Sequence, residues 1–188
     1  MGWGNLQDIG PREYTCGHCD RLVASRQGWY NPDHGTSRIY ICPNCSAPSH
    51  FSGHGQIPGF RTGETVRNLP QDIAAIYEEA RASAASNCHT GAVLLARKLL
   101  MHIAVAQGAA PGLKFIEYVE HLAAAGFVPP NGKAWVDHIR QKGNEATHEL
   151  VLMGSTESEE LITFVEMLLK FVYEFPSRVP TSAKKGAP

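Results

Sequence analysis

The sequence predicts a mainly α-helical protein with a small metal-stabilised module at its N-terminal end. Two observations lead to this fold class. Four of the five cysteines form two close pairs within about the first 45 residues, and the chain after Pro70 consists of long Ala-, Leu- and Glu-rich segments with helical periodicity. The composition, 43% hydrophobic and 19% charged over 188 residues, is that of an ordinary folded protein.

The cysteine pairs have the spacing of a four-ligand metal site. Cys16 and Cys19 form one pair and Cys42 and Cys45 the other, each with two intervening residues. A tight turn in each pair lets both sulfurs face one tetrahedral ion, so we expect a closed structural Zn²⁺ site. Disulfides or unliganded thiols are the alternative interpretation, and a catalytic zinc would need an open position. Three nearby histidines are candidates to replace one cysteine: His18, His50 and His54.

The fifth cysteine, Cys88, stands alone where the second helix is expected to begin. A lone cysteine of this kind is usually a small buried hydrophobe, so we assign it no role.

The residues around these pairs indicate short strands and turns. Aromatic and β-branched pieces, such as Trp29-Tyr30 and Arg38–Ile41, alternate with Gly, Pro, Asn and Asp. We therefore expect a zinc ribbon over residues 1–52. Residues 53–70 are rich in Gly and Pro and lack apolar periodicity, which predicts a linker or a loop laid across the next domain.

The remainder predicts an antiparallel helical bundle over residues 71–176, followed by a disordered tail, 177–188. The second helix carries apolar residues around most of its circumference, which indicates a central position. We expect about five helices, over residues 72–86, 88–107, 113–125, 135–149 and 155–175. Because these segments carry apolar stripes of their own, we expect the bundle to stay folded when the metal is removed.

The fourth of these helices carries a polar stripe. Arg140, Asn144 and His148 are successive fourth residues, so they lie on one side of a helix. The apolar residues of the same helix, among them Trp135 and Ile139, form a separate face. In the simplest structural interpretation, the stripe forms ion pairs within its own helix and caps the helix end.

The helical part resembles the HEPN superfamily, through a largely uncharacterised family of bacterial, archaeal and phage proteins whose members often carry an N-terminal zinc ribbon. The resemblance covers about residues 69–173. It is carried by Leu69-Pro70, 76–80, 92–100 with Arg97, 116–126, Ile139-Arg140, Gly143-Asn144 and His148. Many HEPN proteins are metal-independent ribonucleases, in which an Arg and a His four to six residues apart meet their dimer mates in a shared cleft. In this chain, seven residues separate Arg140 from His148.

The resemblance implies a homodimer that interacts with nucleic acid and cleaves RNA without a metal. Arg140 would hold the phosphate, His148 would transfer a proton and Asn144 would orient one of them. The implied setting is bacterial or phage defence or counter-defence. The alternative is a non-catalytic module that binds a protein or a nucleotide and is braced by the ribbon, which is itself a possible surface for a protein partner.

Two sequence-wide features limit these functions. The formal net charge of -1 excludes the basic excess of a protein that coats nucleic acid, so any such contact must be local. The N-terminal residues do not resemble a secretory signal, and no apolar run approaches the length of a membrane span. We therefore expect a cytoplasmic protein with no membrane partner.

Overall fold

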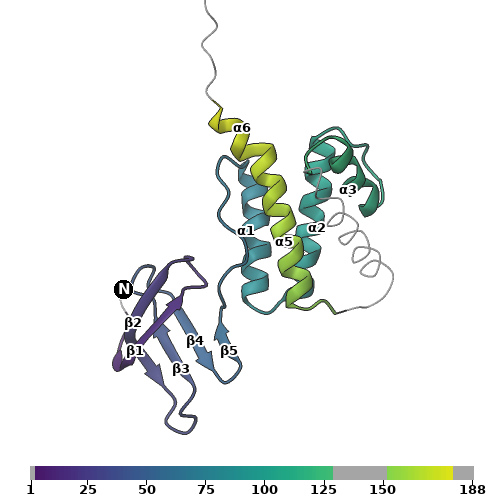
Figure 1. Ribbon diagram of the computed structural model, residues 1–188. Coiled ribbons are helices and arrows are strands. Elements are labelled where there is room, and N and C mark those ends of the chain that lie inside the picture. Colours follow the sequence, from purple (N-terminus) through teal and green to yellow (C-terminus); the bar gives the residue numbers. More distant parts are fainter. Residues whose placement is uncertain (1–2, 129–151, 180–188) are drawn as a thin grey trace, which may run out of the picture.

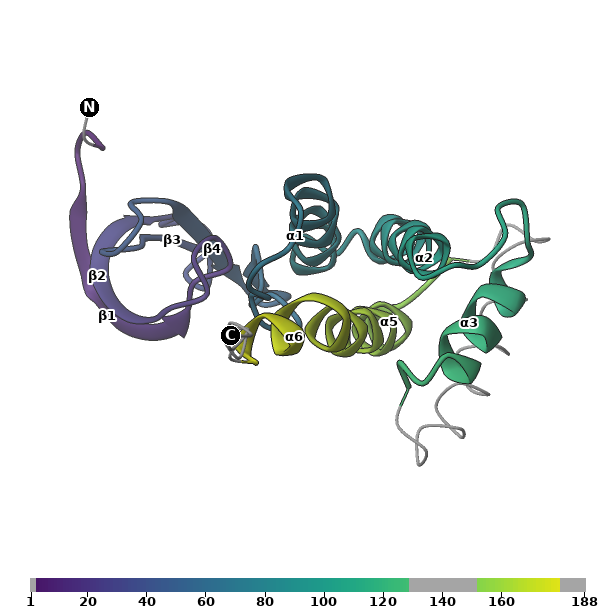
Figure 2. The same cartoon turned by 90° about the horizontal axis from the view of Figure 1, so that it is seen from above.

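The computed structural model describes residues 3–128 and 152–179, which form a β-ribbon followed by a helical domain (Figure 1). Viewed from above, the molecule is elongated, with the ribbon at one end, α3 at the other and the remaining helices between them (Figure 2). The ribbon contacts the helical domain at α1 (Gln71–Ala85), where Arg81 donates to Asp20.

The ribbon is one antiparallel sheet with the strand order β1-β2-β3-β4-β5. Its strands are β1 (Gln7–Thr15), β2 (Leu22–Tyr30), β3 (Arg38–Ile41), β4 (Pro48–Ser52) and β5 (Gly55–Ile57). The strand expected over Arg38–Ile41 is confirmed, and Trp29-Tyr30 ends β2. The sheet extends to Ile57, because β5 pairs with β4. β5 therefore lies within residues 53–70, where the sequence predicts a linker or a loop laid across the next domain.

Two glycines shape the long hairpin of β1 and β2. Gly10, with φ +85°, lies where the register shifts between Asp8 and Arg12, so it allows the bulge there. A Cβ added to Gly28 would lie 1.8 Å from the carbonyl oxygen of Ile39, so only glycine permits this approach of β2 to β3. The hairpin is therefore strongly curved rather than flat (Figure 2).

The helical domain has its core around α2. Its elements are α1 (Gln71–Ala85), α2 (His89–Ala106), α3 (Phe115–Ala124), α5 (Ser155–Leu169), the π-helical turn η2 (Lys170–Glu174) and α6 (Phe175–Arg178). α2 packs against α1, α3 and α5, which confirms its central position. Leu100 and Ile103 of α2 are completely buried, as is Phe164 of α5. None of the described helices combines the length and the apolarity that a bilayer crossing requires.

The predicted fold class, mainly α with a bundle of about five helices, is wrong. Of the described residues, 44% are helical and 19% lie in strands. They form a five-stranded sheet in the N-terminal half and four longer helices, α1, α2, α3 and α5, the last of which continues into η2 and α6. The strand content was underestimated because β1, with the sequence QDIGPREYT, is largely polar and exposed and lacks a strand-like alternation. The helix expected over residues 135–149 lies outside the described residues.

The last helical segment also differs from its prediction. The sequence predicts a helix that ends before Pro176, whereas the described helix continues through η2 into α6 as far as Arg178. Pro176 lies in the first turn of α6, where a missing backbone N–H is tolerated.

Candidate metal centre

Each cysteine pair sits in a turn that contains two backbone hydrogen bonds. In the first, the N–H of Cys16 donates to the carbonyl of Arg21, and the N–H of Asp20 donates to the carbonyl of Cys16, both at 2.9 Å. In the second, the N–H of Cys42 donates to the carbonyl of Ala47, and the N–H of Ser46 donates to the carbonyl of Cys42, again both at 2.9 Å. Asp20 and Ser46 both adopt left-handed backbone conformations, with φ of 56° and 60°. We call these turns the first and second knuckles.

The two knuckles bring the four sulfurs to the spacing of a tetrahedral thiolate site. The Sγ atoms of Cys16 and Cys45 are 3.8 Å apart and those of Cys19 and Cys42 are 3.9 Å apart, and all four lie within 4.8 Å of one another. A tetrahedron with bonds of about 2.3 Å to zinc has edges of about 3.8 Å. The predicted ligand set is therefore brought together as a metal-binding cluster, and the disulfide interpretation is excluded because all four cysteines are free.

Hydrogen bonds stabilise the ionised form of Cys19. Burial opposes its ionisation, but the N–H of Arg21 and the side-chain amide of Asn44 donate to its sulfur and lower its pKa to about 7. The Asn44 amide nitrogen lies 3.4 Å from that sulfur. Asn44 is not among the site residues predicted from the sequence, although an amide between two cysteines of a candidate metal site is well placed to donate to a thiolate.

The thiols of Cys16 and Cys45 resist ionisation in the absence of a cation. Burial, followed by the neighbouring cysteines, raises the pKa of Cys45 to about 12, and burial also raises the pKa of Cys16. Four thiolates this close repel each other strongly unless a cation neutralises them. The donor set therefore fits a thiophilic divalent ion.

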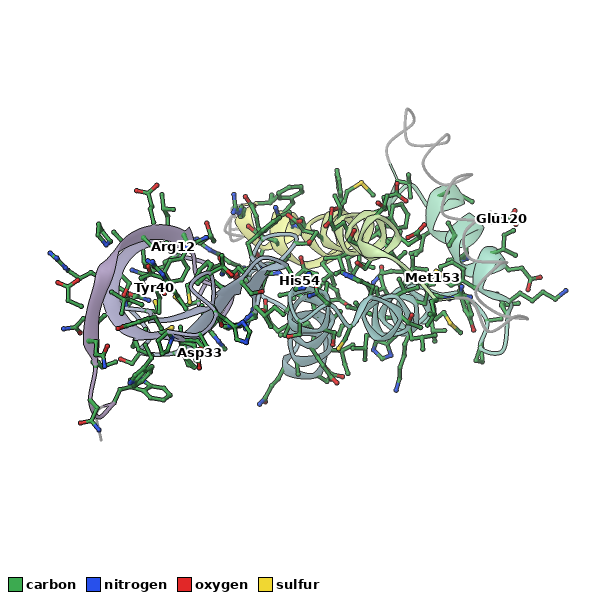
Figure 3. All side chains as sticks on the ribbon, turned by 90° about the horizontal axis from the view of Figure 1, so that it is seen from below. Arg12, Asp33, Tyr40, His54, Glu120 and Met153 are labelled. Carbon is green, nitrogen blue, oxygen red and sulfur yellow. The ribbon has the colours of Figure 1, made fainter. Side chains whose placement is uncertain are left out.

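A buried aromatic cluster packs beside Cys16 and Cys42 of the metal centre. The rings of Tyr14, Tyr40 and Phe51 contact one another with centroids 5.0 to 6.3 Å apart, and the guanidinium of Arg12 lies 4.0 Å from the Phe51 centroid. Figure 3 shows Arg12 and Tyr40 over the interior of the ribbon, at the opposite end of the molecule from Glu120 of α3. Burial, followed by the charge of the nearby cysteines, raises the pKa of Tyr14 to about 12, so its hydroxyl stays neutral.

The histidine alternatives do not belong to this cluster. Nε2 of His18 lies 3.0 Å from the carbonyl oxygen of Pro48, and Nε2 of His50 lies 2.9 Å from the hydroxyl of Ser37. Among the described residues, the ligand group contains the four cysteines and no histidine. His54 is exposed in the turn before β5.

Cys88 precedes α2 and is exposed rather than buried, so the expectation of a small buried hydrophobe is wrong. Cys88 is the N-cap residue of α2, outside the part of the helix that packs into the core.

The predicted stripe of Arg140, Asn144 and His148 lies outside the described residues. Arg97, which belongs to the same resemblance, is in the buried part of α2, with its guanidinium 4.1 Å from the ring centroid of Phe115. This position agrees with a role inside the domain.

Comparison with known proteins identifies the helical part. The profile of a domain of unknown function, DUF4145, matches residues 78–185, more than half of the chain. The chain belongs to the DUF4145 family. The match begins inside α1, so it excludes the metal centre and residues 58–70. No curated protein and no solved structure matched the chain.

Proposed function

We propose that the four cysteines hold one structural zinc ion. The observation that carries this proposal is the near-tetrahedral arrangement of four sulfurs, with Cys16 and Cys42 completely buried. Four thiolates saturate a tetrahedral zinc and leave no position for water or substrate, so the ion supplies folding free energy rather than catalysis.

Metal analysis of protein purified without chelator tests this proposal. We expect one zinc per chain, and loss of zinc from a Cys42→Ser variant but not from the matched control Cys88→Ser. A tetrathiolate site also accepts iron, which would show as a coloured protein with charge-transfer absorption. Iron in place of zinc, or no bound metal, would contradict the proposal.

We propose further that the DUF4145 domain interacts with nucleic acid, and that its leading candidate activity is metal-independent RNA cleavage in bacterial or phage defence or counter-defence. This proposal is supported by the resemblance to HEPN ribonucleases and by the spacing of Arg140, Asn144 and His148 in the sequence. An arginine beside the phosphate and a histidine proton acceptor supply electrostatic and general-base catalysis. The homodimer belongs to the same proposal, since HEPN clefts are shared between two chains.

Incubation of the purified protein with total RNA in EDTA tests the cleavage. We expect products ending in 2′,3′-cyclic phosphate. His148→Ala should abolish cleavage and spare binding, whereas Arg140→Ala should weaken both, because only arginine offers a fixed charged fork to the phosphate. The matched control is Arg26→Ala, an exposed arginine of the ribbon. A monomer in solution, or RNA cleavage unaffected by both substitutions, would contradict the proposal.

The alternative function is a non-catalytic module that binds a protein partner, and one described feature favours it. An apolar groove of about 280 Å³ runs along the exposed side of α5, η2 and the start of α6, bordered by Met167, Phe171 and Phe175. The rings of Phe171 and Phe175 are in edge contact at 5.3 Å, and about two fifths of each side chain is exposed. If the wild type leaves total RNA intact but retains a protein partner that a Phe171→Asp variant releases, the non-catalytic function is favoured and the groove is assigned to partner binding. Retention of the partner by Phe171→Asp would contradict this assignment.

A further inference from the structure

The ribbon is joined to the helical domain by a buried arginine. Arg81 of α1 is 1% exposed, and its guanidinium has a partner for each of its three nitrogens. Nε donates to the carbonyl of Thr62 at 2.9 Å, and Nη1 donates to both carboxylate oxygens of Glu78 at 3.0 Å. Nη2 donates to the carbonyl of Gly63 at 2.6 Å and to the carboxylate of Asp20 at 2.9 Å. Asp20 is the left-handed residue of the first knuckle, so α1 contacts that knuckle directly, next to the ligand Cys19.

A second arginine holds the same knuckle by its backbone. Nε of Arg61 donates to the carbonyl of Gly17 at 2.9 Å, and its Nη1 donates to Glu78 at 2.9 Å. A Cβ added to Gly17 would lie 2.1 Å from the carbonyl oxygen of Gly59, so the connecting segment lies against the knuckle turn itself. The N–H of Gly59 in turn donates to the carbonyl of Ala85, at the end of α1, at 2.7 Å.

We call the four charged residues Asp20, Arg61, Glu78 and Arg81 the clamp. Its two positive and two negative charges balance only when the first knuckle is in place. Burial opposes the positive charge of Arg81, but the carboxylates of Glu78 and Asp20 outweigh it and raise the pKa of Arg81. Two guanidinium groups thus face two carboxylates. Loss of Asp20 would leave a buried cation short of one anionic partner, which is strongly destabilising.

The position of Asp20 depends on the metal centre. Its N–H closes the turn on the carbonyl of Cys16, and Cys19 immediately precedes it in the chain. A metal that draws the sulfurs of Cys16 and Cys19 together therefore also fixes the backbone from which the Asp20 carboxylate reaches α1.

We propose that the metal centre and the DUF4145 domain are energetically coupled through this clamp. Metal binding closes the first knuckle, the closed knuckle presents Asp20 and the Gly17 carbonyl to Arg81 and Arg61, and α1 is stabilised in consequence. The coupling rests on the proposed zinc binding. It is reciprocal, so an intact α1 strengthens zinc binding by the same factor. The ribbon is then a brace of the helical domain, and metal removal weakens the helices instead of sparing them.

The two knuckles provide a matched pair of variants for the test. Asp20→Gly and Ser46→Gly both place glycine at a left-handed position, so their effects on the backbone and on the unfolded chain are alike. Only Asp20→Gly removes a carboxylate bound to α1. Among the described residues, Ser46 makes no hydrogen bond to the helical domain.

The measurement is thermal unfolding of the full-length protein, followed by helical circular dichroism, with zinc bound and after removal by the chelator TPEN. In wild type and in Ser46→Gly, zinc removal should lower the helical Tm by about 5 °C or more. In Asp20→Gly this zinc-dependent shift should fall to less than half. By competition titration, the zinc affinity of Asp20→Gly should be about tenfold lower than that of Ser46→Gly.

Amide hydrogen exchange locates the effect. Zinc removal from the wild type should speed exchange in α1 about tenfold and leave α3, at the far end of the molecule, unchanged. Two results would overturn the coupling but leave the zinc site intact. In one, all three proteins bind zinc but zinc removal does not change the helical Tm. In the other, the two variants have equal zinc-dependent shifts in Tm and equal zinc affinities. If the wild type binds no zinc, the zinc site and the coupling fail together.

Discussion

The two knuckles have the same backbone but different attachments. Each holds two cysteines, closes with the same pair of 2.9 Å hydrogen bonds and turns at a left-handed residue. The first knuckle, through Gly17 and Asp20, is bound to Arg61 and Arg81 of the helical side. The second knuckle accepts a hydrogen bond from the indole of Trp3 at 2.6 Å.

The difference shows that two turns can share one backbone and one arrangement of cysteines while their outer residues make different contacts. A tetrahedral site needs both knuckles to present two sulfurs in the same way, which explains the shared backbone. The residues between and after the cysteines are not ligands. In the first knuckle, Asp20 contacts Arg81 of α1 and Gly17 contacts the segment that precedes α1. The equivalent positions, Pro43 and Ser46, border a groove of about 570 Å³ instead.

The largest expected effect is on the ligands that the two knuckles share. Cys16→Ser and Cys42→Ser should each abolish metal binding and unfold the ribbon, because a structural tetrathiolate zinc supplies about 10 kcal/mol or more of folding free energy. Zinc content and the near-ultraviolet circular dichroism of the ribbon aromatics measure this loss. A ribbon that keeps its tertiary signal in both variants would show that the knuckles hold together without metal.

The next effect should distinguish the first knuckle from the second. Gly17→Ala places a methyl group 2.1 Å from the Gly59 carbonyl oxygen, so the segment after the cis bond Ile57-Pro58 must shift. We expect a loss of about 3 kcal/mol in the free energy of unfolding, measured in urea. The corresponding change in the second knuckle, Pro43→Ala, should cost less than about 1 kcal/mol, because Pro43 borders an open groove. Equal losses would refute the assignment of the first knuckle as the packed one.

Removal of the clamp arginine should have a somewhat smaller effect. Arg81→Met keeps most of the buried volume but leaves the carboxylates of Asp20 and Glu78 without their shared cation. Because those side chains are 31% and 37% exposed, water compensates in part, and we expect a loss of about 2 kcal/mol. The control is Arg26→Met, whose ion pair with Asp8 is well exposed and is expected to contribute less than about 0.5 kcal/mol. The same urea series measures both, and similar losses would argue against the clamp.

The smallest effect should come from the attachment of the second knuckle. Trp3 donates to the Ser46 carbonyl and meets Trp29 edge-on with centroids 5.7 Å apart, but it is 47% exposed. Trp3→Ala should therefore cost about 1 kcal/mol of ribbon stability, with zinc content unchanged. Loss of zinc from this variant would show that the N-terminal residues help to assemble the metal centre.

Local patterns predicted the metal ligands and most of the described helices. The two pairs, Cys16 with Cys19 and Cys42 with Cys45, were identifiable because each knuckle is a turn of a few residues. The helices α1, α2, α3 and α5 were identifiable because the 3.6-residue period depends on near neighbours. The polar strand β1 is not predicted from the sequence, since it is held by pairing with β2 more than by burial of its own side chains.

The sequence by itself therefore determined that a four-cysteine centre precedes a helical domain. Only the tertiary structure decided how the two are joined. Arg81 meets Asp20 across 61 residues and Trp3 meets Ser46 across 43, so no local pattern connects them. The Trp3 pair requires the folded ribbon, and the Arg81 pair requires the ribbon packed against α1, because each partner's position is set by tertiary packing rather than by its near neighbours in the sequence.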